Sequence, residues 1–235
     1  NVMVYLMTGF LDSGKTQFLN FTLKQDYFQI DGKTLLILCE EGEEEYDPME
    51  MLKYGVVIER VEEQEDLTEE WLEEMDKKHE PERVVVEYNG MWKVSDFESL
   101  RLPVGWAIEQ KLTTVDASTF QMYLTNLKPL FVEMVRNAEL VLFNRCEDIK
   151  PLAGYRRSVK VVSPQAEVIF EDENGEVENI FEDDVPYDLK APVIEIAKED
   201  YGIWYVDMME NPDRYKGKVV EFTAKVVKPR SFPSK

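Results

Sequence analysis

One stretch near the start of the chain constrains the fold more than any other, because residues 9–16 read Gly-Phe-Leu-Asp-Ser-Gly-Lys-Thr. They match the pattern G-x-x-x-x-G-K-[ST], in which backbone N–H groups surround a diphosphate while the Lys and the hydroxyl residue serve the terminal phosphate and Mg²⁺. An apolar run at 2–7 precedes the match and suits a buried strand, and Phe18, Leu19 and Leu23 follow it at helical spacing. Strand, loop and helix thus occur in the order that a phosphate-binding P-loop requires.

Apolar runs and helical patterns alternate along the first two thirds of the chain. The runs that predict further strands are 34–39, 56–58, 83–87, 112–116, 140–144 and 159–162. A long helical pattern over 120–135 contains Pro129, which we expect to kink or split the helix. This alternation is typical of right-handed β-α-β units. We therefore predict an α/β fold of the P-loop NTPase class, with a mainly parallel sheet covered by helices on both faces.

Two shorter stretches carry local predictions. Asp66 and Glu69, three residues apart, form a capping box that predicts a helix with Trp71 and Leu72 on its apolar face. Residues 91–106 mix aromatic residues with Pro and Gly and are predicted to form an irregular connection.

The composition changes after residue 170 and predicts a second piece. We expect a nucleotide-binding domain at 1–181, a proline-containing linker at 182–192 and a partial small β-rich segment at 193–235. Residues 220–226 alternate as in a half-buried strand. A lone strand cannot bury its apolar face, so we expect the start of an incomplete β domain. The alternative is that this strand joins a sheet elsewhere, in this molecule or in a neighbour.

The charge balance argues against several kinds of partner. The chain has 48 acidic and 27 basic residues, and its formal net charge of -21 repels a phosphate backbone or an anionic membrane surface. No apolar run reaches the roughly 20 residues of a membrane span. Cys39, Cys146 and a single His supply neither a disulfide framework nor a Cys/His zinc cluster. We expect a soluble cytoplasmic protein that neither binds nucleic acid nor inserts into a membrane.

Polar residues close the predicted strands, and open α/β sheets bind ligands at that edge. Glu40 follows one strand and opens an acidic run, 40–47, which a solvated loop would also explain. Glu87 ends another strand, where P-loop proteins place an acid that organises Mg²⁺.

Residues 144–147, Asn-Arg-Cys-Glu, stand where GTPases carry N-K-x-D. The acid of that element accepts two hydrogen bonds from guanine, and adenine offers no such pair of donors on that edge. Here Arg145 replaces the Lys and Glu147 replaces the Asp. The element predicts a modest preference for guanine.

These motifs, in this order, resemble those of the CobW-like GTPases, a P-loop family grouped with HypB and UreG that includes nickel- and cobalt-insertion chaperones. The resemblance covers about residues 1–170. The stretches that carry it are 9–16 (family G-F-L-G-A-G-K-T), 39–43 (family N-E-x-G-E, with Cys39 in place of Asn), 87–91 (family E-T-S-G-L), 115–117 (family V-D-A) and 163–166 (family N-P-x-A). Residues 211–219 also resemble the opening of a small β domain of uncharacterised permease-associated proteins.

The motifs and this resemblance together imply a GTP/GDP-binding protein that uses Mg²⁺ and hydrolyses GTP slowly as a switch or chaperone-type GTPase. Lys15 and Glu87 take the catalytic roles, and Thr16, Glu40 and Glu87 serve the metal. The expected nucleotide-binding residues are Gly9, Asp12, Ser13, Gly14, Lys15, Thr16, Gln17, Asn144, Arg145, Glu147 and Ser163. Of these, Ser163 is expected near the base on the resemblance alone.

Two other functions stay open on the residues alone. A scaffold module could hold nucleotide without turnover, since no arginine finger or catalytic Gln can be named. An ATP-using kinase or ATPase would carry the same phosphate-binding loop. The sequence names neither a protein partner nor a metal-handling client.

The sequence also yields a prediction about transition metals. The family's Cys-x-Cys-Cys motif would lie near Gly55, where residues 55–59 read Gly-Val-Val-Ile-Glu. Zinc and cobalt sites draw on Cys and His ligands, so we expect no tight site for either ion in residues 1–181, only Mg²⁺ with nucleotide and weak binding of hard ions at the acidic loop. Metal analysis after zinc loading and dialysis against a chelator checks this. Stoichiometric retained zinc would contradict it.

Overall fold

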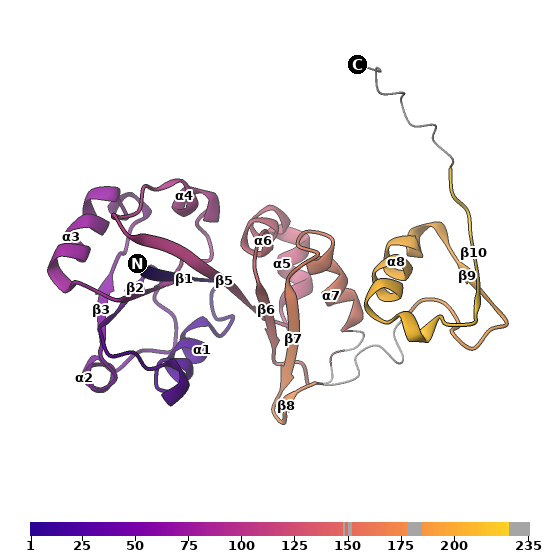
Figure 1. Cartoon of the computed structure of the whole chain (residues 1–235), viewed down its shortest axis with the longest axis horizontal. Coiled ribbons are helices and arrows are strands. Elements are labelled where there is room, and N and C mark those ends of the chain that lie inside the picture. Colours follow the sequence, from indigo (N-terminus) through magenta and orange to yellow (C-terminus); the bar gives the residue numbers. More distant parts are fainter. Residues whose placement is uncertain (148, 150–151, 178–184, 226–235) are drawn as a thin grey trace, which may run out of the picture. The chain divides into compact units, whose positions relative to one another are not determined.

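The computed structural model in Figure 1 describes the chain except for residues 148, 150–151, 178–184 and 226–235. The chain forms two compact units, Asn1–Glu178 and Asn179–Lys235. The predicted domain boundary at residue 181 falls outside the described residues, as does the start of the predicted linker at 182.

The first unit is built on one sheet, which contains eight strands within the described residues, in the order β3-β2-β4-β1-β5-β6-β7-β8. The strands are β1 (Val2–Thr8), β2 (Thr34–Leu38), β3 (Val56–Arg60), β4 (Arg83–Glu87), β5 (Trp106–Asp116), β6 (Leu140–Asn144), β7 (Glu167–Asp172) and β8 (Gly175–Glu176). Neighbours among β1 to β7 pair in parallel, and β8 pairs antiparallel with β7. The predicted mainly parallel sheet is confirmed.

Helices cover both faces of this sheet. They are α1 (Lys15–Thr22), α2 (Pro48–Lys53), α3 (Glu69–His79), α4 (Val94–Ser99), α5 (Phe120–Asn126), α6 (Lys128–Val135) and α7 (Ala153–Lys160). The connections that contain α1 and α2 step one way along the sheet and the later ones step the other way, so right-handed crossovers put the two sets on opposite faces. Figure 1 shows α1 and α2 on one side of the sheet, with α3 and α4 on the other. The helix predicted over 120–135 divides just before Pro129, as expected.

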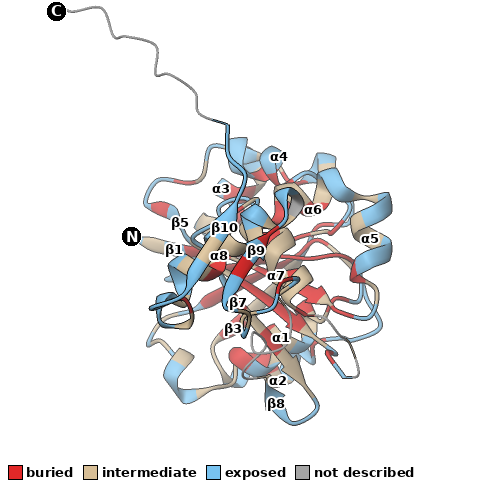
Figure 2. Ribbon diagram, turned by 90° about the vertical axis from the view of Figure 1, so that its right-hand side faces the viewer, coloured by how far each residue is buried: buried red, intermediate tan, exposed pale blue. Residues whose placement is uncertain are grey.

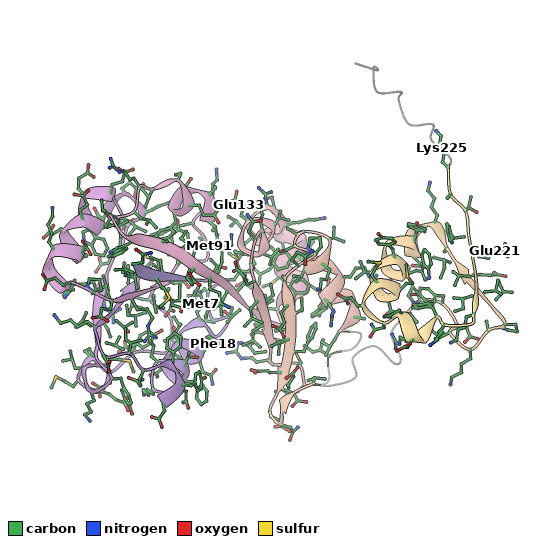
Figure 3. The ribbon with its side chains drawn as sticks, viewed as in Figure 1. Met7, Phe18, Met91, Glu133, Glu221 and Lys225 are labelled. Carbon is green, nitrogen blue, oxygen red and sulfur yellow. The ribbon has the colours of Figure 1, made fainter. Side chains whose placement is uncertain are left out.

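The core lies between the sheet and these helices. All residues of β2 and β4 are buried, which explains why their sequences are nearly continuous apolar runs. One cluster joins β1 to α1 and includes Met7, Leu19 and Leu23, with Phe18 packed against it; Met7 and Phe18 are labelled in Figure 3. Figure 2 shows the exposed outer surface of α5, which contrasts with the buried strands.

Two predicted elements are wrong. Val159 and Lys160 end α7 instead of forming a strand, and Val159 is buried together with Tyr155, four residues earlier on the same helix face. A short apolar run does not distinguish a strand from a helix end. The connection predicted over 91–106 contains α4, and β5 begins already at Trp106. The first half of β5 contains exposed polar residues such as Glu109, so its sequence lacks the apolar run that would predict a strand.

The second unit contains α8 (Tyr201–Glu210) and a pair of parallel strands, β9 (Val193–Ile196) and β10 (Val219–Phe222). Its core includes Tyr187, Ile194, Ile196 and Tyr215, and the hydroxyls of the two tyrosines lie 2.8 Å apart. The expected strand therefore has a partner, β9, that the sequence did not predict. Within the described residues, every helix falls short of the length and apolar character needed to cross a bilayer.

The start of α3 differs from the predicted capping box. Thr68 is the N-cap, and its Oγ1 accepts a hydrogen bond from the Trp71 N–H at 3.1 Å. Asp66 instead ends a short 3₁₀ turn, η2 (Gln64–Asp66). The other 3₁₀ turns are η1 (Asp26–Phe28), η3 (Lys198–Asp200) and η4 (Pro212–Arg214).

We expect Thr68→Ala to lower the free energy of unfolding by about 1 kcal/mol, because an N–H at the start of α3 loses its acceptor. Urea denaturation followed by circular dichroism measures the change. Asp66→Ala is the matched control and should change stability by less than about 0.5 kcal/mol. A larger loss for Asp66→Ala than for Thr68→Ala would contradict the observed cap.

Candidate functional site

Five strands bring their polar ends to one edge of the sheet. Gly9 follows β1, Glu40 lies just after β2, and Glu87, Asp116 and Asn144 end β4, β5 and β6. Parallel pairing sets Met7 beside Glu87 and Asp116 beside Asn144, so these ends lie at matching positions along the sheet. Most of the candidate residues predicted from the sequence meet at this edge.

The loop between β1 and α1 curls back on itself. The Ser13 N–H donates to the Phe10 carbonyl at 3.1 Å, and the Ser13 hydroxyl lies 2.9 Å from the hydroxyl of Thr114. Gly14 has a φ of 92°, and a Cβ at this position would lie 2.5 Å from Asn144 Nδ2, so both conformation and space require glycine. No side chain caps α1, whose first backbone N–H groups are therefore available to an anion.

Lys15 places a charge inside this loop. Its side chain is 3% exposed. Nζ donates to the carbonyl oxygens of Gly9 at 2.8 Å and Phe10 at 2.9 Å, and to Oε2 of Glu40 at 2.5 Å. The ammonium thus links the loop to the segment that follows β2.

Glu87 is the acidic centre beside the loop. Thr16 donates its hydroxyl to Oε1 at 2.6 Å, and Tyr46 donates to Oε2 at 2.5 Å. Burial raises the pKa of the Glu87 carboxyl above its ordinary value, although the hydrogen bonds from Thr16 and Tyr46 oppose the shift. A hydroxyl and a carboxylate side by side form a hard oxygen donor set, which suits Mg²⁺.

Cys39 lies at the same edge but is not available as a thiolate. It is buried, and burial together with the nearby carboxylates of Glu87 and Glu40 raises the pKa of its thiol far above the ordinary value. Within the described residues, no group of three or more His, Cys, Asp or Glu side chains could hold a metal ion.

Gly90 brings a backbone N–H next to the loop. This N–H donates to Oε1 of Glu40 at 3.1 Å, and a Cβ on Gly90 would lie 2.4 Å from the Gly9 carbonyl oxygen. Only a glycine allows the chain after β4 to approach the phosphate-binding loop so closely.

Asn144 and Arg145 tie the end of β6 to the loop. Asn144 Nδ2 donates to the Ser13 carbonyl at 2.8 Å, while its Oδ1 is buried and has no hydrogen-bond partner among the described atoms. Arg145 donates to the Asp12 carbonyl at 2.8 Å and pairs with Asp116 Oδ2 at 2.6 Å. An acceptor left buried without a donor is costly, so Asn144 is prepared for a ligand that donates.

A groove of about 870 Å³ opens beside these residues. Part of it runs over apolar side chains of β5 and β6, such as Leu112 and Leu142. Its polar lining includes the predicted residues Gly14, Gln17, Asn144, Arg145 and Glu147.

Ser163 is the one predicted nucleotide-binding residue that the structure places elsewhere. Its hydroxyl donates to the Ala138 carbonyl at 3.4 Å. Ala138 precedes β6 and Ser163 precedes β7, so both lie at the edge where these strands begin, opposite the phosphate-binding loop. The expectation that Ser163 lies near the base is corrected.

Gly90, Asp116 and Tyr46 belong to the site but were not among the predicted residues. Asp116 pairs with Arg145, and Tyr46 bonds Glu87. The position of Asp116 at a strand end was a usable signal. Tyr46 is the one aromatic residue in an acidic run and carried no comparable signal.

Residues 3–170 match the profile of a known family, described as CobW/HypB/UreG, nucleotide-binding domain. The chain belongs to this family. The resemblance noted from the motifs is confirmed, and the first unit is a CobW/HypB/UreG nucleotide-binding domain. No curated protein sequence matches the chain.

Solved structures share the fold of this CobW/HypB/UreG domain. The zinc-bound YjiA GTPase from E. coli is 22% identical with a TM-score of 0.55, over 75% of this chain and 59% of that one. A zinc-bound triple mutant of the YjiA GTPase is also 22% identical with a TM-score of 0.54, over 75% and 59%. The chain thus spans 59% of the length of these neighbours.

We expect Lys15→Ala to weaken binding of Mg-nucleotide at least about tenfold, or about 1.4 kcal/mol, because a charged donor is lost from the phosphate-binding loop. Isothermal titration calorimetry measures the affinity. Lys24→Ala is the control, since Lys24 is partly exposed after α1 and pairs with Glu50 at 2.5 Å. Equal affinities for wild type and Lys15→Ala would contradict the assignment of the loop.

Proposed function

We propose that the chain binds GTP and GDP with Mg²⁺ and hydrolyses GTP slowly, as a switch or chaperone-type GTPase. The observation that carries the proposal is the convergence at one sheet edge of the Lys15 loop, the Thr16–Glu87 pair and the Asn144–Arg145 element. Phosphoryl transfer depends mainly on positioning and charge neutralisation, and these groups supply both. The description of YjiA as a GTPase is in keeping with it.

The residues fit a magnesium ion held with the nucleotide. Thr16 Oγ1 and Glu87 Oε1 lie 2.6 Å apart, and Tyr46 holds the other oxygen of Glu87. A bound Mg²⁺ would neutralise charge on the phosphates. Glu87 would orient the metal or the attacking water, while Lys15 and the loop N–H groups bind the phosphates.

The groove beside β6 supplies the part that recognises the base. The buried Oδ1 of Asn144 needs a donor, and Glu147 is an exposed acid on the groove wall. Arg145 carries a planar guanidinium, which is suited to stacking on a flat ring. A donor-rich edge such as that of guanine satisfies these acceptors better than adenine does.

We expect slow turnover because the groups assigned to the phosphates are Lys15, Thr16 and Glu87. This set includes neither an arginine finger nor a catalytic Gln. A scaffold that holds nucleotide without turnover is the competing function. Single-turnover hydrolysis by purified protein, with Lys15→Ala as the blank, separates the two. We also propose that the protein acts in the cytoplasm, together with a protein partner that the sequence does not identify.

We expect GTP to compete better than ATP for the site, but modestly, and Glu147→Ala to reduce that preference because an acceptor for guanine is lost. Competition against a fluorescent guanine nucleotide measures the ratio. Glu173→Ala is the matched control, since Glu173 lines the same groove and carries the same charge. Equal competition by GTP and ATP in the wild type would favour the kinase or ATPase alternative.

A further inference from the structure

Glu40 occupies two donors of the site at once. Its Oε2 accepts from Lys15 Nζ at 2.5 Å and its Oε1 accepts from the Gly90 N–H at 3.1 Å. The side chains of Lys15 and Glu40 are 3% and 9% exposed, so water does not screen this pair. Both carboxylate oxygens are therefore engaged by groups at the mouth of the loop.

The same two donors are those that a terminal phosphate requires. In P-loop proteins the Lys reaches the β- and γ-phosphates. The Gly90 N–H bonds the same carboxylate as Lys15, so it is a second donor within reach of an anion bound at Lys15. A carboxylate and a phosphate both accept through adjacent oxygens that share negative charge. They cannot occupy the Lys15 ammonium and the Gly90 N–H at the same time, since the two anions would repel each other at short range.

We infer that Glu40 is a specificity-determining residue that competes with the terminal phosphate, so that it weakens binding of nucleoside triphosphate more than binding of diphosphate. A diphosphate has to replace Glu40 at Lys15 alone, whereas a triphosphate has to replace it at both Lys15 and Gly90. This inference rests on the proposed nucleotide-binding function.

Displacement of Glu40 would move the segment that follows it. Tyr46, near the end of that segment, bonds Glu87 at 2.5 Å, and Asp47 caps α2 through the Met49 N–H at 2.9 Å. The other end is held by the Cys39 N–H, which donates to the Glu87 carbonyl at 2.9 Å. Residues 40–46 thus form a segment that is held by hydrogen bonds at both ends. Binding of the terminal phosphate would displace Glu40 from Lys15 and Gly90.

The pairing also bears on the metal role predicted for Glu40 from the sequence. Its oxygens are bonded to Lys15 and Gly90, so the proposed magnesium site depends on Thr16 and Glu87 instead. The two roles predict opposite results: removing a metal ligand weakens binding of Mg-triphosphate, whereas removing a competitor strengthens it.

The test compares Glu40→Gln with wild type in titrations of a fluorescent, non-hydrolysable GTP analogue and of fluorescent GDP, both with Mg²⁺. The Gln side chain keeps the size but loses the charge. We expect triphosphate affinity to rise at least about tenfold and GDP affinity to rise less, so that the ratio shifts toward triphosphate. Glu41→Gln is the matched control, because Glu41 is 75% exposed and its carboxylate pairs with Arg60 at 3.3 Å, away from Lys15 and Gly90; it should leave both affinities unchanged.

A second variant, Glu40→Asp, covers the case in which Glu40→Gln fails to fold, since the shorter side chain cannot span both donors and should also favour triphosphate. An unchanged ratio or weaker triphosphate binding would overturn the inference and leave the proposed function standing. Absence of nucleotide binding in wild type and in both variants would overturn the proposed function and the inference with it.

Discussion

A buried ammonium organises the functional edge of this protein. Lys15 is almost fully buried, and a charge in that position is tolerated only where acceptors surround it. Two loop carbonyls and Glu40 supply those acceptors, and each bond fixes a different part of the chain. The two carbonyl bonds close the loop around the Lys15 side chain, and the bond to Glu40 holds the segment after β2 against the loop. Glu40 in turn accepts a hydrogen bond from the Gly90 N–H.

Parallel topology explains why so few residues suffice to build the site. Strands that run the same way end at one edge, so groups separated by more than a hundred residues become neighbours without a dedicated linking element. The Ser13 carbonyl and Asn144 Nδ2 lie 2.8 Å apart across 131 residues of sequence, and Thr16 meets Glu87 across 71. The first contact joins the phosphate-binding loop to the end of β6, and the second joins the first turn of α1 to the end of β4, whose five residues are all buried. Such packing limits how far the polar groups can move.

The sequence predicted the fold where patterns were long and the site where motifs were local. Continuous apolar runs identified β2, β4 and β6, because such runs are typical of strands that are buried on both faces of a parallel sheet. Short or mixed patterns failed, as at Val159, since four residues fit a helix end as well as a strand. The order of strand, loop and helix at Lys15 predicted an anion-binding loop, but no sequence rule could pair Lys15 with Glu40 or Tyr46 with Glu87. Ser163 shows the limit of transferring a role by motif alone, because the fold puts it at the opposite edge.

Electrostatics gives the site its character. Two of its cationic groups, Lys15 and Arg145, are each paired with a carboxylate of the chain, Glu40 and Asp116. With a net charge of -21, the protein as a whole opposes the approach of an anionic nucleotide. At physiological ionic strength that field is screened beyond about 8 Å, so the short-range donors decide binding. In the proposed mechanism, the nucleotide arrives with its own cation, and its terminal phosphate replaces the Glu40 carboxylate at Lys15 and Gly90. Because one anion replaces another at the same donors, the free energy of the exchange depends on how many of these donors each anion engages. A triphosphate and a diphosphate differ in that respect.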